Sequence, residues 1–319
     1  MILIADDMHP LLLEGLKANQ IPFNYQPQIT LLEVLDIIST YEGLVVRSKF
    51  MVDKQFIDCA PRLKFIARAG SGTDNIDAEY AIGKNIAIIN APEGLCDAVA
   101  EHAIGLILGL HHKIVDSHLE VMNQAWNREA NRGFELMGST VGIIGYGHTG
   151  SALARKLSGF GVKVIAYDKY KIHEQNEAGQ FFFDPYATSV SLNAIYEQTD
   201  ILSMHVPLTP ETSGWVNKKF FEQFKKPIVF INTSRGGIVN TFELTLAMEQ
   251  GKVRGAALDV MEQEPPFSKN GDTTAWYQGL RKMDQVILTP HIAGWSTQSY
   301  ERISEVLLKK INLFYNNQN

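Results

Sequence analysis

The sequence has little cysteine and no long hydrophobic run. Its 319 residues include only two cysteines, Cys59 and Cys96, far apart and in no metal-ligand pattern. A disulfide framework is therefore excluded, and we expect no metal site. No stretch reaches the ~18 consecutive apolar residues of a membrane span, and the most apolar helix candidate, 98–110, contains Glu101 and His102. The first residues lack the basic segment of a signal peptide, so we expect no membrane partner and a cytoplasmic, reducing location.

An excess of positive charge is also missing. The 29 Lys and Arg against 35 Asp and Glu give a formal net charge of −6, which argues against a general nucleic-acid-binding surface. Hydrophobic residues make up 45% and charged residues 20%, the balance of an ordinary globular protein. The length corresponds to roughly two domains, each large enough to bury a core without disulfides.

Short runs rich in Ile and Val alternate with longer amphipathic segments along the whole chain. Most runs are apolar on both faces, as parallel strands covered by helices must be. The predicted strands are Ile2–Ala5, Gly43–Arg47, Leu63–Arg68, Ile86–Asn90, Thr140–Ile144, Lys163–Tyr167, Ile201–Val206, Ile228–Asn232, Gly255–Asp259 and Val286–Thr289. The predicted helices include Pro10–Asn19, Ala98–Leu110, Ser151–Phe160, Phe242–Gln250 and Gln298–Phe314.

These repeated βαβ units predict an α/β fold with open parallel sheets. Two doubly wound, Rossmann-like domains with a cleft between them are favoured, because one twisted sheet of ten or more strands is rare. The break is expected after the turn-rich stretch 90–94. We predict that the helix after it runs from Cys96 to near Asn123, before a polar segment at 127–138.

A glycine loop follows the predicted strand Thr140–Ile144 at once. It reads Gly145-Tyr146-Gly147-His148-Thr149-Gly150 and leads into a helix, the context that dinucleotide binding requires. In that motif the first glycine allows the tight turn, the second lets the backbone approach a pyrophosphate, and the third lets the helix pack on the strand. The pyrophosphate would bind the amides of His148 and Thr149 at the helix N-terminus.

Asp168 supports this interpretation of the loop. It ends the next predicted strand, 18 residues beyond Gly150, and an acid there suits the ribose hydroxyls of NAD and repels the 2′-phosphate of NADP. Lys169 follows directly and weakens the preference for NAD. The alternative interpretation is a glycine turn with an acid there by chance.

Three later strands end in reactive residues, Arg235, Glu264 and His291. Ligands of open α/β sheets bind beyond the carboxyl ends of the strands, so we expect the three side chains on the cofactor side. There the histidine is the acid/base, the glutamate orients it and raises its pKa, and the arginine binds a carboxylate. Taken singly, each has a structural alternative: a surface ion pair, a solvated turn acid and a loop histidine.

With these motifs the chain resembles the D-isomer-specific 2-hydroxyacid dehydrogenases, and among them the D-3-phosphoglycerate dehydrogenases most closely. The glycine loop and the three strand ends belong to the resemblance, and further motifs cover nearly the whole chain. These are Val45-Val46-Arg47-Ser48, Arg68-Ala69-Gly70-Ser71-Gly72-Thr73-Asp74-Asn75-Ile76-Asp77, Asn90-Ala91-Pro92, Asp97-Ala98-Val99-Ala100-Glu101-His102, His205-Val206-Pro207-Leu208-Thr209, Leu258-Asp259-Val260 and Pro290-His291.

The resemblance implies that Arg235, Glu264 and His291 are catalytic and that NAD is the cofactor. Asp168 is expected to hold the adenosine ribose, and Asp259 the nicotinamide carboxamide. The other implied cofactor residues are Gly145, Gly147, His148, Thr149, Gly150, His205, Val206, Pro207, Thr233, Ser234 and Gly294. The implied substrate residues are Arg47, Ser71, Gly72 and Asn75, together with Arg235 and His291.

The resemblance also implies a domain organisation. A substrate-binding, flavodoxin-like domain comprises 1–94 plus 295–319, because the C-terminal helix returns to it, and the NAD-binding Rossmann domain comprises 95–294. A homodimer is expected through the helix near 98–123. Because the sequence ends at Asn319, we expect no serine feedback through the C-terminal regulatory domain that many D-3-phosphoglycerate dehydrogenases carry.

The implied reaction is hydride transfer between NAD(H) and a D-2-hydroxy acid or 2-oxo acid. We expect 3-phosphoglycerate as substrate, because Arg47 and Arg68 suit a second anionic group; glyoxylate, hydroxypyruvate and D-lactate remain alternatives. An alternative of another class is an NAD-sensing regulatory protein on the same fold. Tyr80 and Lys84 match the Y-x-x-x-K of short-chain reductases, but they precede the glycine loop and we interpret the match as chance.

Overall fold

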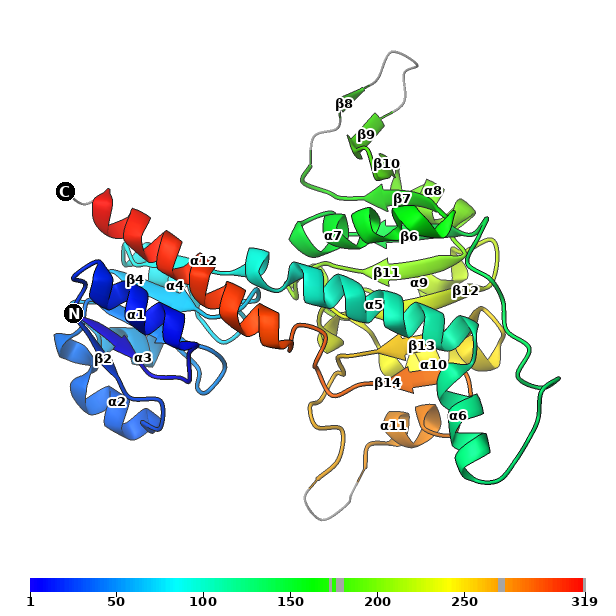
Figure 1. Cartoon of the computed structure of the whole chain (residues 1–319), viewed down its shortest axis with the longest axis horizontal. Helices are drawn as coiled ribbons and strands as arrows, with labels where there is room; N and C mark the ends of the chain where they lie inside the picture. Colours follow the sequence, from blue (N-terminus) through cyan, green and yellow to red (C-terminus); the bar gives the residue numbers. More distant parts are fainter. Residues whose placement is uncertain (172–173, 176–180, 269–272, 318–319) are drawn as a thin grey trace. The chain divides into compact units, whose positions relative to one another are not determined.

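The computed structural model describes residues 1–171, 174–175, 181–268 and 273–317 (Figure 1). The chain divides into two compact units, Met1–Cys96 together with Trp295–Asn319, and Asp97–Gly294. The sequence predicts these limits at 94/95 and 294/295. Each unit contains a largely parallel sheet with helices packed on it, which confirms the predicted α/β class.

The first unit has a five-stranded parallel sheet in the order β2-β1-β3-β4-β5. Its strands are β1 (Ile2–Ile4), β2 (Phe23–Tyr25), β3 (Gly43–Val46), β4 (Phe65–Arg68) and β5 (Ala87–Asn90). All residues of β1 and β3 are buried, because central parallel strands are covered on both faces. The sequence does not predict β2, a half-buried edge strand of three residues without Ile or Val.

Helices of the first unit begin where the sequence offers a cap. They are α1 (Pro10–Ala18), α2 (Leu31–Ile37), α3 (Lys54–Asp58), α4 (Ala78–Gly83) and α12 (Thr297–Asn316), with 3₁₀ turns η1 (Ile38–Thr40) and η2 (Pro92–Gly94). The side chains of Asp53 and Asp77 accept backbone N–H groups at the starts of α3 and α4, and Thr30 forms a capping box with Glu33.

Helix α12 completes the hydrophobic core of the first unit. Its Ile303, Leu307 and Ile311 are buried in one cluster with Leu12 and Leu16 of α1. The two helices approach so closely that a Cβ on Gly15 would lie 2.1 Å from a methyl carbon of Leu308. The C-terminal helix predicted over 298–314 is therefore confirmed, and its buried face belongs to the first unit.

The second unit has a nine-stranded sheet in the order β14-β13-β12-β11-β6-β7-β10-β9-β8. Neighbours from β14 to β10 are parallel, whereas β9 runs antiparallel to both β10 and β8. The strands are β6 (Thr140–Ile144), β7 (Lys163–Tyr167), β8 (Glu174–Gln175), β9 (Phe181–Asp184), β10 (Ala187–Ser189), β11 (Ile201–Met204), β12 (Ile228–Asn232), β13 (Val253–Leu258) and β14 (Val286–Leu288). The sequence does not predict β8, β9 and β10, none of which contains the Ile and Val that mark the predicted strands.

Helices cover this sheet, and the longest predicted one is broken. They are α5 (Cys96–His111), α6 (Ile114–Met122), α7 (His148–Leu157), α8 (Leu192–Gln198), α9 (Lys218–Glu222), α10 (Thr241–Glu249) and α11 (Ala275–Leu280), with 3₁₀ turns η3 (Ser158–Phe160) and η4 (Gly236–Ile238). None of the helices among the described residues is long and apolar enough to cross a membrane.

The single helix predicted from Cys96 to near Asn123 is wrong, because Lys113 separates α5 from α6. Lys113 has a φ of +50°, in the left-handed region, and its Nζ donates to the carbonyl of Ala130 at 2.7 Å. The carbonyl of His111 accepts the N–H of Phe134 at 2.9 Å. The segment after α6 therefore folds back against the end of α5 and bonds a carbonyl that a continuous helix would use itself.

Candidate active site

The glycine loop after β6 is shaped by close contacts. Gly145 has a φ of +92°, and a Cβ there would lie 2.5 Å from the carbonyl oxygen of His205. A Cβ on Gly150 would lie 2.2 Å from the carbonyl oxygen of Gly145. Both positions therefore require glycine: the first to turn past the end of β11, and the second to bring α7 onto the loop.

Gly147 has a different environment, because a Cβ there would meet no atom within 4 Å. It is the N-cap of α7, and in this described stretch no side chain caps that end of the helix. The first amides of a helix, His148 and Thr149 among them, have no acceptor within the helix and attract anions. An open approach and uncapped amides at one place fit the pyrophosphate of a dinucleotide.

Asp168 lies beside this loop, directly after β7. Its carboxylate accepts the N–H of Tyr146 at 2.7 Å and the N–H of Tyr170 at 2.9 Å, one on each oxygen. Each oxygen keeps a lone pair for a ribose hydroxyl. Lys169, whose charge weakens the NAD preference predicted from sequence, is paired with Glu211 at 2.6 Å. The carboxylate of Glu211 therefore offsets the positive charge of Lys169.

The end of β11 supplies His205, Val206 and Pro207. The His205 ring lies 2.8 Å from the hydroxyl of Ser203, and burial lowers the pKa of His205 to about 4. Its imidazole is therefore neutral at physiological pH. Since the carbonyl of His205 touches Gly145, this segment lines the same end of the sheet as the glycine loop.

The backbone at the end of β12 is held by Asn232, to which the sequence alone assigns no site role. Its Oδ1 accepts the N–H of Ser234 at 3.0 Å and the Ser234 hydroxyl at 2.8 Å, and its Nδ2 donates to the carbonyl of Arg235 at 3.0 Å. Asn232 is fully buried and thus fixes the backbone that carries Arg235. The hydroxyl of Thr233 is buried without a hydrogen-bond partner among the described residues, as expected of a cofactor-facing group.

An imidazole and a carboxylate meet at the ends of β13 and β14. The Nδ1 of His291 lies 2.7 Å from Oε2 of Glu264, and the N–H of Met261 donates to Oε1 at 2.9 Å. The hydrogen bond to Glu264 raises the pKa of His291, against burial. Burial alone would raise the pKa of Glu264, but the hydrogen bonds from His291 and Met261 lower it. The pair is therefore built to carry an imidazolium beside a carboxylate.

Arg235 belongs to the same cluster. Its positive charge acts on His291 and lowers the pKa of the ring, opposing Glu264. The loop after β12 also touches the loop after β13, since a Cβ on Gly236 would lie 1.8 Å from the carbonyl oxygen of Met261. The structure thus brings the loop that carries Arg235 against the loop that leads to Glu264, the partner of His291.

Asp259 and Gly294 lie at the turn that carries His291. The Asp259 side chain has no exposed area, and its carboxylate accepts the N–H groups of Ile292 and Ala293, just before Gly294. The predicted contact of Asp259 with a nicotinamide carboxamide stays a prediction; here protein donors enclose the carboxylate. The sequence assigns no site role to two of its neighbours, His102 and Thr289.

The predicted substrate residues outside this cluster lie in the first unit. Arg47 follows β3, and its guanidinium carbon lies 4.2 Å from the ring centroid of Trp295. Asn75 donates to the carbonyl of Arg47 at 3.1 Å, and Asn90 donates to the carbonyl of Ser71 at 2.7 Å, next to Gly72. These bonds order the loops after β3 and β4, and the substrate role of these residues stays a prediction.

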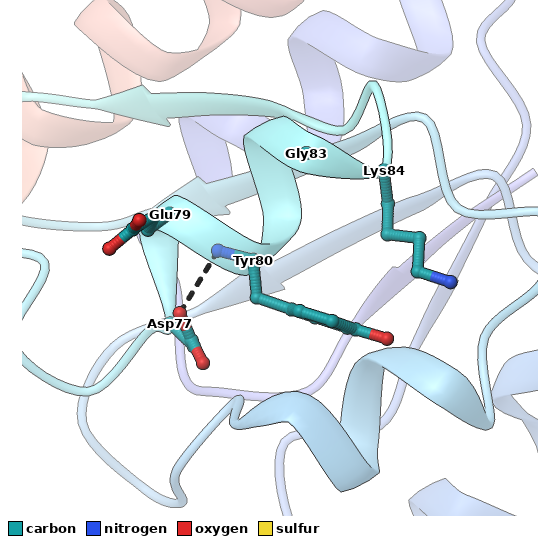
Figure 2. Close-up of a pocket in the computed structure, with 5 residues that line it drawn as sticks. All are labelled: Asp77, Glu79, Tyr80, Gly83 and Lys84. Atoms are coloured by element: carbon teal, nitrogen blue, oxygen red, sulfur yellow. Dashed lines mark hydrogen bonds between the residues drawn. The ribbon is translucent and has the colours of Figure 1, made fainter.

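A shallow pocket on the first unit contains none of the predicted site residues. Its volume is about 420 Å³, and it is lined by Asp77, Glu79, Tyr80, Gly83 and Lys84 (Figure 2). The Tyr80 hydroxyl donates to Asp58 at 2.5 Å and accepts from Lys54 at 3.0 Å, so Tyr80 belongs to an exposed cluster of charged side chains. Among the described residues no group of three or more His, Cys, Asp or Glu is placed to hold a metal ion.

Comparison with known proteins identifies the family. Residues 104–293 match the model of the D-isomer specific 2-hydroxyacid dehydrogenase, NAD binding domain. This match covers more than half of the 319 residues, so the chain belongs to the D-isomer specific 2-hydroxyacid dehydrogenase family. It is a family of NAD-dependent enzymes, and the cofactor predicted from the glycine loop is confirmed.

Individual relatives differ in their substrates. The D-3-phosphoglycerate dehydrogenase of Archaeoglobus fulgidus is 34% identical over 310 residues, which are 97% of this chain and 56% of that protein. The hydroxypyruvate reductase of Thermotoga maritima is 35% identical over 279 residues, 88% of this chain and 86% of that protein. This chain spans about half the length of several D-3-phosphoglycerate dehydrogenases that it matches.

Solved structures share the whole fold. The crystal structure of D-lactate dehydrogenase from Aquifex aeolicus, complexed with NAD and lactic acid, has a TM-score of 0.79 and 28% identity, covering 99% of this chain and 95% of that one. D-2-hydroxyisocaproate dehydrogenase has a TM-score of 0.83 at 23% identity and shows the fold alone.

Proposed function

We propose that this chain catalyses reversible hydride transfer between NAD(H) and a D-2-hydroxy acid or its 2-oxo acid. The observation that carries the proposal is the 2.7 Å bond between His291 and Glu264 within reach of the Arg235 charge, on the family's NAD-binding domain. An acid/base histidine with a carboxylate partner and a guanidinium is the set that oxidation of a hydroxy acid needs.

In this proposal the proton moves through His291. A carboxylate only accepts, so Nδ1 carries the hydrogen shared with Glu264, and Nε2 is the atom that exchanges a proton with the substrate. In oxidation Nε2 takes the hydroxyl proton, and in reduction it returns a proton to the carbonyl oxygen. Glu264 stabilises the imidazolium formed in between. Bound NAD(H) accepts or supplies the hydride.

Arg235 orients the substrate in this proposal. Its guanidinium offers paired donors to the substrate carboxylate, which holds C2 and its oxygen toward His291. The bond from Asn232 to the Arg235 carbonyl fixes the backbone from which the guanidinium extends. The predicted contacts of Arg47, Ser71, Gly72 and Asn75 with the substrate belong to the same proposal.

For the substrate we propose 3-phosphoglycerate and its oxidised product, as in serine biosynthesis. Arg47 and Arg68 of the first unit supply two cations for a second anionic group, and relatives named D-3-phosphoglycerate dehydrogenase match up to 98% of this chain. Hydroxypyruvate, glyoxylate and D-lactate are the alternatives, since a hydroxypyruvate reductase is 35% identical and a D-lactate dehydrogenase 28% identical to this chain.

A substrate panel tests the proposal. Purified protein is assayed with NAD and NADP in the oxidation of 3-phosphoglycerate, D-glycerate and D-lactate, and in the reduction of hydroxypyruvate and glyoxylate. We expect the highest kcat/KM with the phosphorylated acid and NAD. A higher kcat/KM with an unphosphorylated acid would instead favour a hydroxypyruvate or glyoxylate reductase or a D-lactate dehydrogenase. Tight NAD binding without turnover of any of these acids would favour the NAD-sensing regulator.

We also propose a cytoplasmic homodimer formed through the region near 98–123. Helix α6 and the segment after it expose large apolar side chains: Ile114, Val115, Leu119, Val121, Met122, Trp126, Phe134 and Met137. Trp126 is 77% and Met122 69% exposed, a concentration typical of surfaces that another chain covers. Sedimentation should give twice the 35.6 kDa chain mass, and Leu119→Glu should shift it toward the monomer.

A further inference from the structure

A polar network connects α5 with the turn that carries His291. The carboxylate of Asp259 accepts the hydroxyl of Thr289 at 2.6 Å and the N–H of Ile292 at 2.9 Å on Oδ1, and the N–H of Ala293 at 2.8 Å on Oδ2. The backbone carbonyl of Asp259 accepts the N–H of His291 at 2.8 Å. One buried residue therefore holds four of the five residues from 289 to 293.

His291 depends on this support because its backbone is unusual. Its φ of +56° lies in the left-handed region, which residues with a Cβ seldom adopt. Such a conformation persists only where surrounding contacts impose it. The bonds to Asp259 on both sides of the His291 Cα are such contacts, and they determine where the imidazole points.

His102 approaches the same carboxylate from α5. Its Nε2 lies 3.1 Å from the Thr289 hydroxyl and 3.5 Å from Oδ1 of Asp259. The single hydroxyl hydrogen of Thr289 is donated to Asp259, so its oxygen must accept from His102. His102 therefore carries its hydrogen on Nε2 and acts as a donor toward both groups.

The packing of α5 on the sheet makes this contact a fixed one. A Cβ on Gly109 would lie 2.9 Å from a methyl carbon of Ile287 in β14, so the helix is pressed against the strand that precedes the turn (Figure 1). The His102 side chain is only 21% exposed.

Charge adds a second effect of the network. Burial alone would raise the pKa of Asp259, but the bonds from His102, Thr289 and the two backbone N–H groups lower it. The Asp259 carboxylate is therefore ionised, and its charge helps to raise the pKa of His291. Besides Asp259, the charges that act on the His291 ring are those of Glu264, which raises its pKa, and Arg235, which lowers it.

We propose that His102 is a positioning residue for His291: it donates Nε2–H to Thr289 and Asp259, and so keeps the Asp259 carboxylate bound to the turn of residues 291–293. This inference rests on the proposed function, since it gives His102 a part in the work of His291. His102 itself touches no reacting atom and acts through Thr289 and Asp259.

Two matched pairs of variants test the network by kinetics. His102→Leu removes the donor, and His102→Gln keeps an N–H near the position of Nε2; Thr289→Val removes the hydroxyl, and Thr289→Ser keeps it. We expect His102→Leu and Thr289→Val to lower kcat about 10- to 100-fold at an unchanged KM for NAD, the effect of a slightly misplaced catalytic group. The Gln and Ser variants should recover most of the loss. The double variant should be no worse than the poorer single one, because both act on one carboxylate.

Two further readouts need no turnover. Histidine NMR of the cofactor-free protein, assigned with a His291→Gln sample, should show a lower His291 pKa in His102→Leu. The amides of Ile292 and Ala293 should exchange with solvent faster in the same variant. If His102→Leu does not fold, the comparison of Thr289→Val with Thr289→Ser carries the test.

The possible failures are distinguishable. A folded His102→Leu protein with wild-type kcat, His291 pKa and amide exchange overturns the positioning role, and so does a Gln variant as impaired as the Leu variant, which would indicate packing alone. If instead the wild type oxidises none of the acids, the proposed function fails, and the NMR and exchange measurements still decide whether His102 holds the turn.

Discussion

Replacing Glu264 by glutamine tests the acid/base pair most directly. The substitution keeps the size of the side chain and removes the charge that faces Nδ1 of His291 at 2.7 Å. A hydrogen bond to a charged group is worth roughly 1.5–3 kcal/mol. The His291 and Glu264 side chains are 51% and 38% exposed, so solvent screening favours the lower end of that range. About 1.4 kcal/mol corresponds to a factor of ten, and we expect kcat to fall about tenfold.

The pH profile of the variant tests the direction in which the pKa of His291 changes, whatever the size of the loss in kcat. Glu264 raises the pKa of His291, so oxidation, which needs the neutral ring, is lost as pH falls through that raised pKa. Reduction needs the imidazolium and is lost as pH rises through it. In Glu264→Gln the acidic limb of the oxidation profile and the basic limb of the reduction profile should both move to lower pH. At neutral pH the rate of reduction should fall more than the rate of oxidation.

Rapid-mixing kinetics in both directions across pH 5–10, with saturating cofactor, measures these limbs. Glu249→Gln is the charge-matched control, because Glu249 is exposed at the end of α10 and forms no part of the cluster. Limbs that stay in place, or that move to higher pH, would refute the assignment of Glu264 as the partner of the catalytic imidazole.

Three further predictions concern the cofactor and the acid/base. His291→Gln should lower kcat by about 10²–10⁴ while fluorescence titration still shows NADH binding; wild-type turnover would remove His291 from the mechanism. Asp168→Ala should lower the ratio of kcat/KM with NAD to kcat/KM with NADP. An unchanged ratio would mean that residues other than Asp168 determine the preference for NAD. Gly147→Ala should leave the melting temperature unchanged and weaken NADH binding, whereas Gly150→Ala, with a Cβ 2.2 Å from a carbonyl oxygen, should lower the melting temperature; equal effects would contradict the different surroundings of the two glycines.

Most of the parallel sheet was predictable because its information is local. Central strands such as β3 and β12 are buried on both faces, and this appears in the sequence as a continuous apolar run. The edge strand β2 and the two-residue β8 lack such runs, because their sequences, Phe-Asn-Tyr and Glu-Gln, contain polar residues. The break between α5 and α6 was not predictable, because it depends on Phe134, twenty-one residues after Lys113, reaching back to His111.

Some residues of the candidate site were likewise predictable from local sequence, and others were not. Arg235, Glu264 and His291 were identifiable since each follows a predicted strand, and parallel strands end at one edge of the sheet. His102 stands in one of the motifs of the family resemblance, but no role was assigned to it or to Asn232, because a histidine inside an apolar helix and an asparagine at a strand end have many structural uses. Their partners at Thr289 and Arg235 become visible only in three dimensions. An asparagine followed two residues later by serine is at least a turn signal that could have indicated Asn232.

The first unit is built from both ends of the described chain, and this has a consequence for folding during synthesis. The first unit closes its core with Ile303, Leu307 and Ile311 of α12, which a ribosome adds only after all of Asp97–Gly294. Until then the side of Leu12 and Leu16 that packs against α12 has no cover, while the intervening unit already has its whole sequence. The order of translation therefore makes the first unit the last to complete its core, although most of its residues are synthesised first.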